Sequence, residues 1–174
     1  RNLTISGELD AATLDISGDA DIDGTMEADA YTLGGTSFIK IEGTNFTDSL
    51  LVGHATTGTL DAASNNTGIG IDALNAITTA DSNTAVGTDA GGLITISPYN
   101  VLVGDNAGAA LATGNGNNTF VGRTAGYYNA TGQQNTGIGR DALYGASGNN
   151  NSYNVGVGYR SLYTLDDGDN NISI

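Results

Sequence analysis

The sequence predicts an all-β fold, a parallel β-roll or β-solenoid whose coils are about 17 residues long. Three observations lead to this prediction. A motif of the form Asn-x-x-[Ile/Val]-Gly recurs at almost constant spacing from residue 66 onward, after a degenerate copy at residues 49–53 that begins with Ser. Apolar β-branched residues alternate with other residues inside each motif, as in a half-buried strand. The 174 residues include 27 Gly but no Cys and no Trp, so thin coils must be stabilised by repeated backbone pairing rather than by a thick core.

A glycine ends each motif and marks the repeat. Successive glycines lie 17, 17, 17, 18, 17 and 19 residues apart. Glycine suits a position where the backbone turns with positive φ, or where a neighbouring backbone comes too close for a Cβ atom. The repeat glycines are Gly53, Gly70, Gly87, Gly104, Gly122, Gly139 and Gly158.

The rest of the unit also has a pattern. Alternation places Ile69 on the same strand face as Thr67, two residues earlier. A small residue, such as Ala73, follows three positions after each glycine, and an apolar residue such as Ile77 usually follows eleven positions after the Asn. We expect this apolar residue to lie on a second, shorter strand that faces the first. Seven such coils would form a rod of roughly 34 Å at the usual spacing between strands.

The N-terminal part has a different rhythm. Leu-Thr-Ile-Ser-Gly at residues 3–7 is followed eleven residues later by Leu-Asp-Ile-Ser-Gly, and apolar and acidic residues alternate up to Ala30. A single chain with this pattern buries only one line of side chains, so it needs partner chains to be stable. We predict an extended β stalk at residues 1–36, a linker at residues 37–48 and β-roll repeats at residues 49–174.

Charge and composition exclude several classes of partner. The net charge of −14 repels phosphate backbones and anionic bilayers, so we expect no nucleic-acid binding. We find no apolar run of about 18 residues and therefore expect no membrane insertion in this segment. Without Cys, an extracellular protein of this kind is held together by other means, of which oligomerisation is the first candidate. Because the chain starts at Arg1 and stops within an eighth motif at Ile174, we expect it to be an excerpt of a longer polypeptide.

The repeat resembles two known groups. The Asn-x-x-[Ile/Val]-Gly-x-x-[Ala/Ser] unit is similar to the head repeat of trimeric autotransporter adhesins, in which three β-rolls pack together. The fuller form at residues 135–143 is more similar to repeats of bacteriophage tail fibres, which often follow stretches like Ile16 to Thr25. The longer coil favours the fibre. The resemblance implies a homotrimer in a virion tail fibre, outside the cell, that contributes to adhesion to a glycan or protein of the host-cell surface; the alternative is the head domain of a bacterial adhesin.

Two motifs resemble ligand-binding loops. Gly68-Ile-Gly-Ile-Asp-Ala and Gly137-Ile-Gly-Arg-Asp-Ala match a dinucleotide fingerprint, but neither opens the helix of a βαβ unit and both are in register with the repeat. The first half of a calcium loop is present in Asp19, Asp21 and Asp23, with Glu27 at the ninth position. Ala30 stands where the loop needs a bidentate Glu, so a solvated strand face is the simpler interpretation. We expect no cofactor and keep Ca²⁺ as an alternative.

The sequence does not indicate an enzyme. His54 is the only histidine and has no Ser or Cys partner at a recognisable spacing. Asp72, Asp89 and Asp141 recur at one position of the repeat, which favours a structural ladder over a pair of catalytic carboxylates. A polysaccharide depolymerase on a β-solenoid is the third hypothesis, after the fibre and the adhesin.

Aromatic residues give the best indication of a recognition surface. Tyr127, Tyr144 and Tyr163 occupy one repeat position, nine after the Asn, and Arg123 and Arg140 lie among them. An exposed row of tyrosines can stack on sugars. The alternative is that this row seals the flank of the coils or a seam between chains.

Overall fold

The computed structural model describes residues 31–33, 36–43, 46–52, 61–114, 116–146, 150–166 and 168–174. All regular elements in these ranges are β-strands, most of them three residues long. None of the described residues forms a helix with the length and hydrophobicity needed to cross a bilayer. The strands are β1 (Tyr31–Leu33), β2 (Thr36–Gly43), β3 (Phe46–Val52), β4 (Ala63–Ser64), β5 (Thr67–Ile69), β6 (Thr84–Val86), β7 (Val101–Val103), β8 (Thr119–Val121), β9 (Thr136–Ile138), β10 (Val155–Val157) and β11 (Ile172–Ser173).

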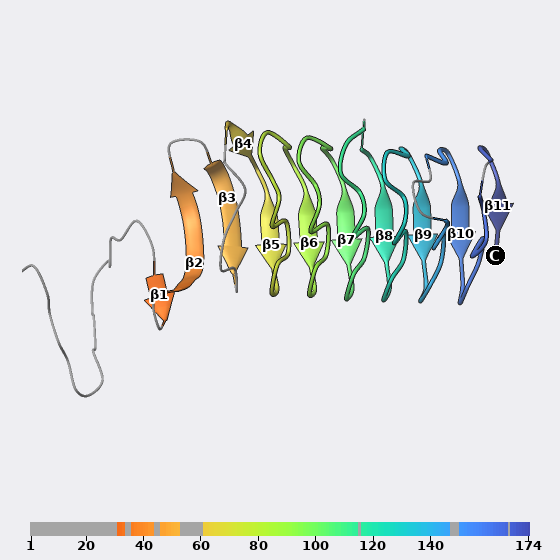
Figure 1. Cartoon of the computed structure of the whole chain (residues 1–174), viewed down its shortest axis with the longest axis horizontal. Coiled ribbons are helices and arrows are strands. Elements are labelled where there is room, and N and C mark those ends of the chain that lie inside the picture. Colours follow the sequence, from red (N-terminus) through yellow and green to blue (C-terminus); the bar gives the residue numbers. More distant parts are fainter. Residues whose placement is uncertain are drawn as a thin grey trace, which may run out of the picture.

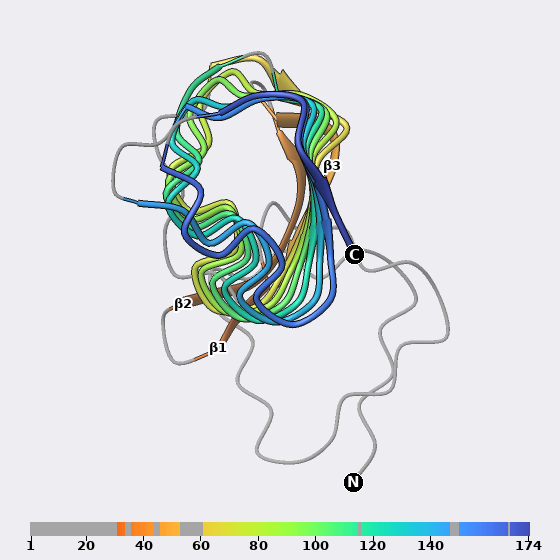
Figure 2. The ribbon, with the colours of Figure 1, turned by 90° about the vertical axis from the view of Figure 1, so that its right-hand side faces the viewer.

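Strands β3 and β5 to β11 form one parallel row along a rod (Figure 1). Each strand pairs with the equivalent residues of the next coil, so that Val101 lies between Thr84 and Thr119. Seen along the rod, the coils superpose on one another, with the strands forming one wall of the cross-section (Figure 2). The predicted parallel β-solenoid of about seven coils is confirmed.

An antiparallel hairpin precedes the first coil. Strand β2 pairs with β1 on one side and with β3 on the other, and the end of β3 turns parallel to β5. Most of the stretch 37–48, for which the sequence predicts a linker, therefore lies in strands. Alternation of Ile39 and Ile41 with Lys40 and Glu42 suits a strand, and the hairpin covers a sheet edge that would otherwise be open. The stalk predicted at residues 1–36 falls almost entirely outside the described residues.

The second strand expected eleven residues after the Asn does not form at that position in the described coils, although β4 is a short second strand in the first coil. Ile77, Ile94 and Leu111 lie in turns and irregular segments, although all three side chains are fully buried as apolar residues of the core. Left-handed residues before them, such as Leu74 with φ of 56°, bend the chain too often for a strand. The coils still pair on this side, because the carbonyl oxygen of Thr95 accepts hydrogen bonds from the amides of Thr78, Thr79 and Ala80 over 3.1–3.2 Å.

Each of the strands β5 to β10 turns its middle residue into the rod and its two outer residues toward the surface. Leu102 and Phe120 are fully buried, whereas Val101, one residue before Leu102, is 41% exposed. The face that Ile69 shares with Thr67 is therefore the outer face of the sheet. A row of Thr, Val and Ile side chains follows this face along the rod.

The repeat glycines from Gly70 to Gly139 have both of the predicted properties, a positive φ and a close neighbouring backbone. Gly104 has a φ of 135°, and a Cβ atom there would lie 2.6 Å from the carbonyl carbon and oxygen of Gly122. The same stacking of backbone on backbone occurs at Gly70, Gly87, Gly122 and Gly139. Gly53 lies outside the described residues.

The asparagine that opens each motif forms a buried ladder. The Oδ1 atom of Asn83 accepts from both the backbone amide and the Nδ2 of Asn100, each over 2.9 Å. Nδ2 of Asn100 also donates to the carbonyl oxygen of Pro98 over 3.1 Å. Equivalent bonds join the asparagines from Asn66 to Asn171. Each side-chain amide thereby satisfies backbone groups that would otherwise be buried without a hydrogen-bond partner.

Two core positions compensate each other in volume. Phe120 is the largest fully buried side chain, and the residue six positions later in its coil is Gly126, whose missing side chain leaves room for the ring. In the next coil the order is reversed, with Gly137 followed by Leu143. A large residue at both positions would overfill the coil, whereas a small residue at both would leave a cavity unless neighbouring coils filled it.

Candidate functional site

Three tyrosines of successive coils form a continuous stack on the flank of the rod. The rings of Tyr127 and Tyr144 lie 5.4 Å apart at 13°, and those of Tyr144 and Tyr163 lie 5.0 Å apart at 19°. Their spacing follows the distance between coils, because each ring stands at the same place in its coil. The structure thus brings together the three tyrosines singled out in the sequence.

Tyr128 supports this stack from the side. Its ring meets Tyr127 edge-on at 4.7 Å and Tyr144 edge-on at 5.2 Å, both close to perpendicular. Burial of the hydroxyl group, together with the neighbouring Tyr128, raises the pKa of Tyr144. The sequence pattern did not single out Tyr128, although the Tyr-Tyr pair at residues 127–128 was a visible signal.

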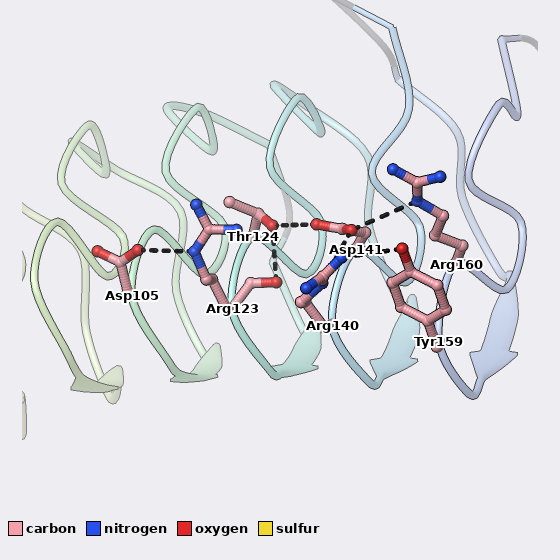
Figure 3. Close-up of polar contacts among 7 residues, drawn as sticks. All are labelled: Asp105, Arg123, Thr124, Arg140, Asp141, Tyr159 and Arg160. Carbon is pink, nitrogen blue, oxygen red and sulfur yellow. Dashed lines mark hydrogen bonds and ion pairs between the residues drawn. The ribbon is translucent and has the colours of Figure 1, made fainter.

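A row of charged side chains runs along the rod from Asp105 to Arg160 (Figure 3). Arg123 bonds through Nε to Asp105 of the preceding coil over 3.4 Å, with both side chains about half exposed. Nη2 of Arg140 donates to the hydroxyl of Tyr159 over 2.8 Å, and the guanidinium of Arg160 lies 4.7 Å from the ring centre of Tyr163. Exposed ion pairs of this type contribute at most about 1 kcal/mol each, so the row is a weak source of stability.

Asp141 is the exception, because it is buried and has several partners. Thr124 of the preceding coil donates its hydroxyl to Oδ1 over 2.5 Å. The Nε atoms of Arg140 and Arg160 both face Oδ2, over 3.2 Å and 3.5 Å. The hydrogen bond from Thr124, followed by the charge of Arg140, holds the pKa of Asp141 below its ordinary value, although burial acts in the opposite direction.

Replacing Thr124 by Val is expected to raise the pKa of Asp141, because the variant keeps the shape of the side chain but loses the donor. The folded-state pKa of Asp141 is lower than its unfolded value of about 3.9, so its ionised form stabilises the fold above that pH. This stabilisation is lost as pH falls through the lower folded pKa. The variant should lose less free energy of unfolding over this pH range, because its folded pKa is closer to the unfolded value. Carboxyl ¹³C NMR titration between about pH 2 and 6 measures the shift.

The control for this titration is Thr88→Val. Thr88 is exposed and lies one residue before Asp89, which occupies the repeat position of Thr124 two coils earlier. It should leave the titration of Asp141 unchanged. An unchanged Asp141 pKa in Thr124→Val would show that the arginines alone depress it.

Other candidate residues are not brought together in the described structure. The three recurring aspartates each occupy a left-handed position, with φ of 57° at Asp72, 52° at Asp89 and 60° at Asp141. Asp and Asn tolerate this conformation, which accounts for their recurrence without catalysis. Within the described ranges no three His, Asp or Glu side chains lie close enough to hold a metal ion. The calcium candidates and His54 fall outside those ranges.

The chain matches no protein-family model, and neither a curated protein nor a solved structure shows significant similarity to it.

Proposed function

We propose that this chain is a shaft segment of a homotrimeric bacteriophage tail fibre that contributes to attachment to the host cell. The observation that carries the proposal is the outer face of the strand wall. Parallel sheets normally have both faces covered, yet here Ile69, Val101 and Ile138 are each 41% exposed on a face lined by Thr, Val and Ile.

A second and third copy of the same chain suit this face best. The face repeats with the spacing of the coils, so identical chains can align their rows of β-branched side chains in register. Coils that differ little from one another also suit a spacer, because adding coils lengthens the rod without changing its cross-section. The Tyr stack and the Arg row form a separate surface that a host-cell molecule can contact.

The oligomeric state tests the fibre proposal. Sedimentation equilibrium is expected to give three times the chain mass of 17.5 kDa. The double variant Val101→Glu, Ile138→Glu places charges on the outer face of the sheet and is expected to sediment as single chains. A matched charge on an exposed turn, Thr79→Glu, should leave the trimer intact.

Two results would contradict the proposal: a wild-type chain that stays monomeric at all concentrations, or a double variant that still trimerises. The adhesin alternative also predicts a trimer, but it places the protein on the bacterial surface instead of on the virion. Immunogold labelling with antibodies against the chain separates the two, because a fibre is labelled on virion tails and an adhesin on bacterial surfaces.

A further inference from the structure

The Tyr stack ends in an open notch on the flank of the rod. The repeat position of Tyr127 is occupied by Ala109 one coil earlier and by Gly92 two coils earlier. A hollow of about 660 Å³ lies there, bordered by these three residues and by Tyr128. Because Tyr144 covers one face of the Tyr127 ring, the opposite face borders the hollow.

The fold does not impose this notch. A Cβ atom on Gly92 would meet no atom closer than 3.4 Å, which is ordinary contact, and Gly92 has no left-handed φ. Tyr127, Tyr144 and Tyr163 show that the same position accepts a large ring. Small residues in two consecutive coils therefore leave room for something other than the chain itself.

The walls of the notch combine an aromatic face with mixed polar groups. The ring of Tyr127 is electron-rich on its face and attracts polarised C–H groups. Asn75, Asp89 and Asn106 line the polar side of the notch. Among the described residues, neither Asn75 nor Asp89 uses its side chain in a hydrogen bond or ion pair, so an amide and a carboxylate remain for a ligand.

We propose that the notch binds one neutral pyranose ring of a host-surface glycan, stacked on the free face of Tyr127. A pyranose has an apolar C–H face for the ring and hydroxyl groups that both donate and accept, as the amide of Asn75 and the carboxylate of Asp89 require. The carboxylate and the net charge of −14 disfavour acidic sugars. That the sugar belongs to a host-cell glycan rests on the proposed attachment function, whereas the binding of a sugar in the notch does not.

The test is saturation-transfer difference NMR on the full chain. The probes are the methyl glycosides of glucose, galactose, mannose and N-acetylglucosamine, each at millimolar concentration, with methylguanidinium chloride as a planar cation. We expect transfer to the C–H face of at least one glycoside. Ala109→Tyr should abolish it while keeping the melting temperature, because the new ring extends the stack into the notch.

A matched control is Tyr99→Ala, which removes an exposed tyrosine that does not line the notch. It should leave the transfer unchanged. The proposal is overturned if no glycoside gives transfer, if only methylguanidinium does, or if transfer persists in Ala109→Tyr. A trimer that binds none of the sugars refutes the notch alone, whereas a sugar-binding monomer refutes the fibre proposal alone.

Discussion

Replacing Gly104 by alanine is expected to prevent the central coils from folding as one cooperative unit. The φ of 135° at Gly104 lies in a region that is essentially restricted to glycine and costs other residues about 1–3 kcal/mol. In addition, the new methyl group would lie 2.6 Å from the carbonyl carbon and oxygen of Gly122. Both atoms belong to the backbone of the next coil, so neither can move without separating β7 from β8. We expect the free energy of unfolding to fall by well above about 3 kcal/mol. Circular dichroism should show this as a broad thermal transition at low temperature.

Two other glycines serve as matched controls for this prediction. Gly158 has a similar φ of 119°, but a Cβ atom there meets nothing within 4 Å, so Gly158→Ala reports the backbone strain without the clash. Gly92→Ala has neither problem and should be neutral or stabilising by up to about 1 kcal/mol. If Gly104→Ala melts like Gly92→Ala, the close approach of the coils does not determine the repeat.

Sequence reasoning could predict the features that recur at one position of every coil. The spacing of the glycines predicted the parallel coils, and the small residues at Ala73 and its equivalents are buried as their size suggests. The shared repeat position of Tyr127, Tyr144 and Tyr163 likewise placed them in one row. In these cases a periodic pattern along the chain becomes a row in space, because a solenoid stacks equivalent residues.

Three features of the coils were not predicted. The side chain of Asn100 points into the rod because Asn83 and Asn118 of the adjacent coils bond to it there, and the sequence pattern does not indicate this pairing. The predicted second strand is wrong at Ile94 and its equivalents, because left-handed residues such as Asp89 and Gly91 keep the segment in turns although the apolar side chain is buried. The notch beside Tyr127 arises because Ala109 and Gly92 are small at its repeat position, and a small residue gives no signal in a pattern of recurring side chains.

Exchanging the two compensating core residues of one coil should reveal a strong coupling between them. Phe120→Gly alone removes the largest fully buried side chain and is expected to cost about 3–5 kcal/mol, the range for a buried Phe replaced by a small residue. Gly126→Leu alone places a Cβ atom against the ring of Phe120 and overfills the coil, at a cost of at least about 1–3 kcal/mol. The left-handed backbone at this position does not forbid leucine, because Leu143 adopts it with a φ of 51°.

The double variant should recover most of the lost stability. Phe120→Gly with Gly126→Leu reproduces the arrangement of Gly137 with Leu143 and of Gly156 with Leu162, which already occur in consecutive coils. Urea unfolding of the wild type, both single variants and the double variant gives the coupling, which we expect to reach about 3 kcal/mol. The mispaired variant Phe120→Gly with Gly108→Leu should gain no such rescue, because a Cβ atom on Gly108 lies 2.8 Å from Leu102, which remains in place. Equal stability of the two double variants would mean that total core volume, rather than its placement within each coil, is what the repeat conserves.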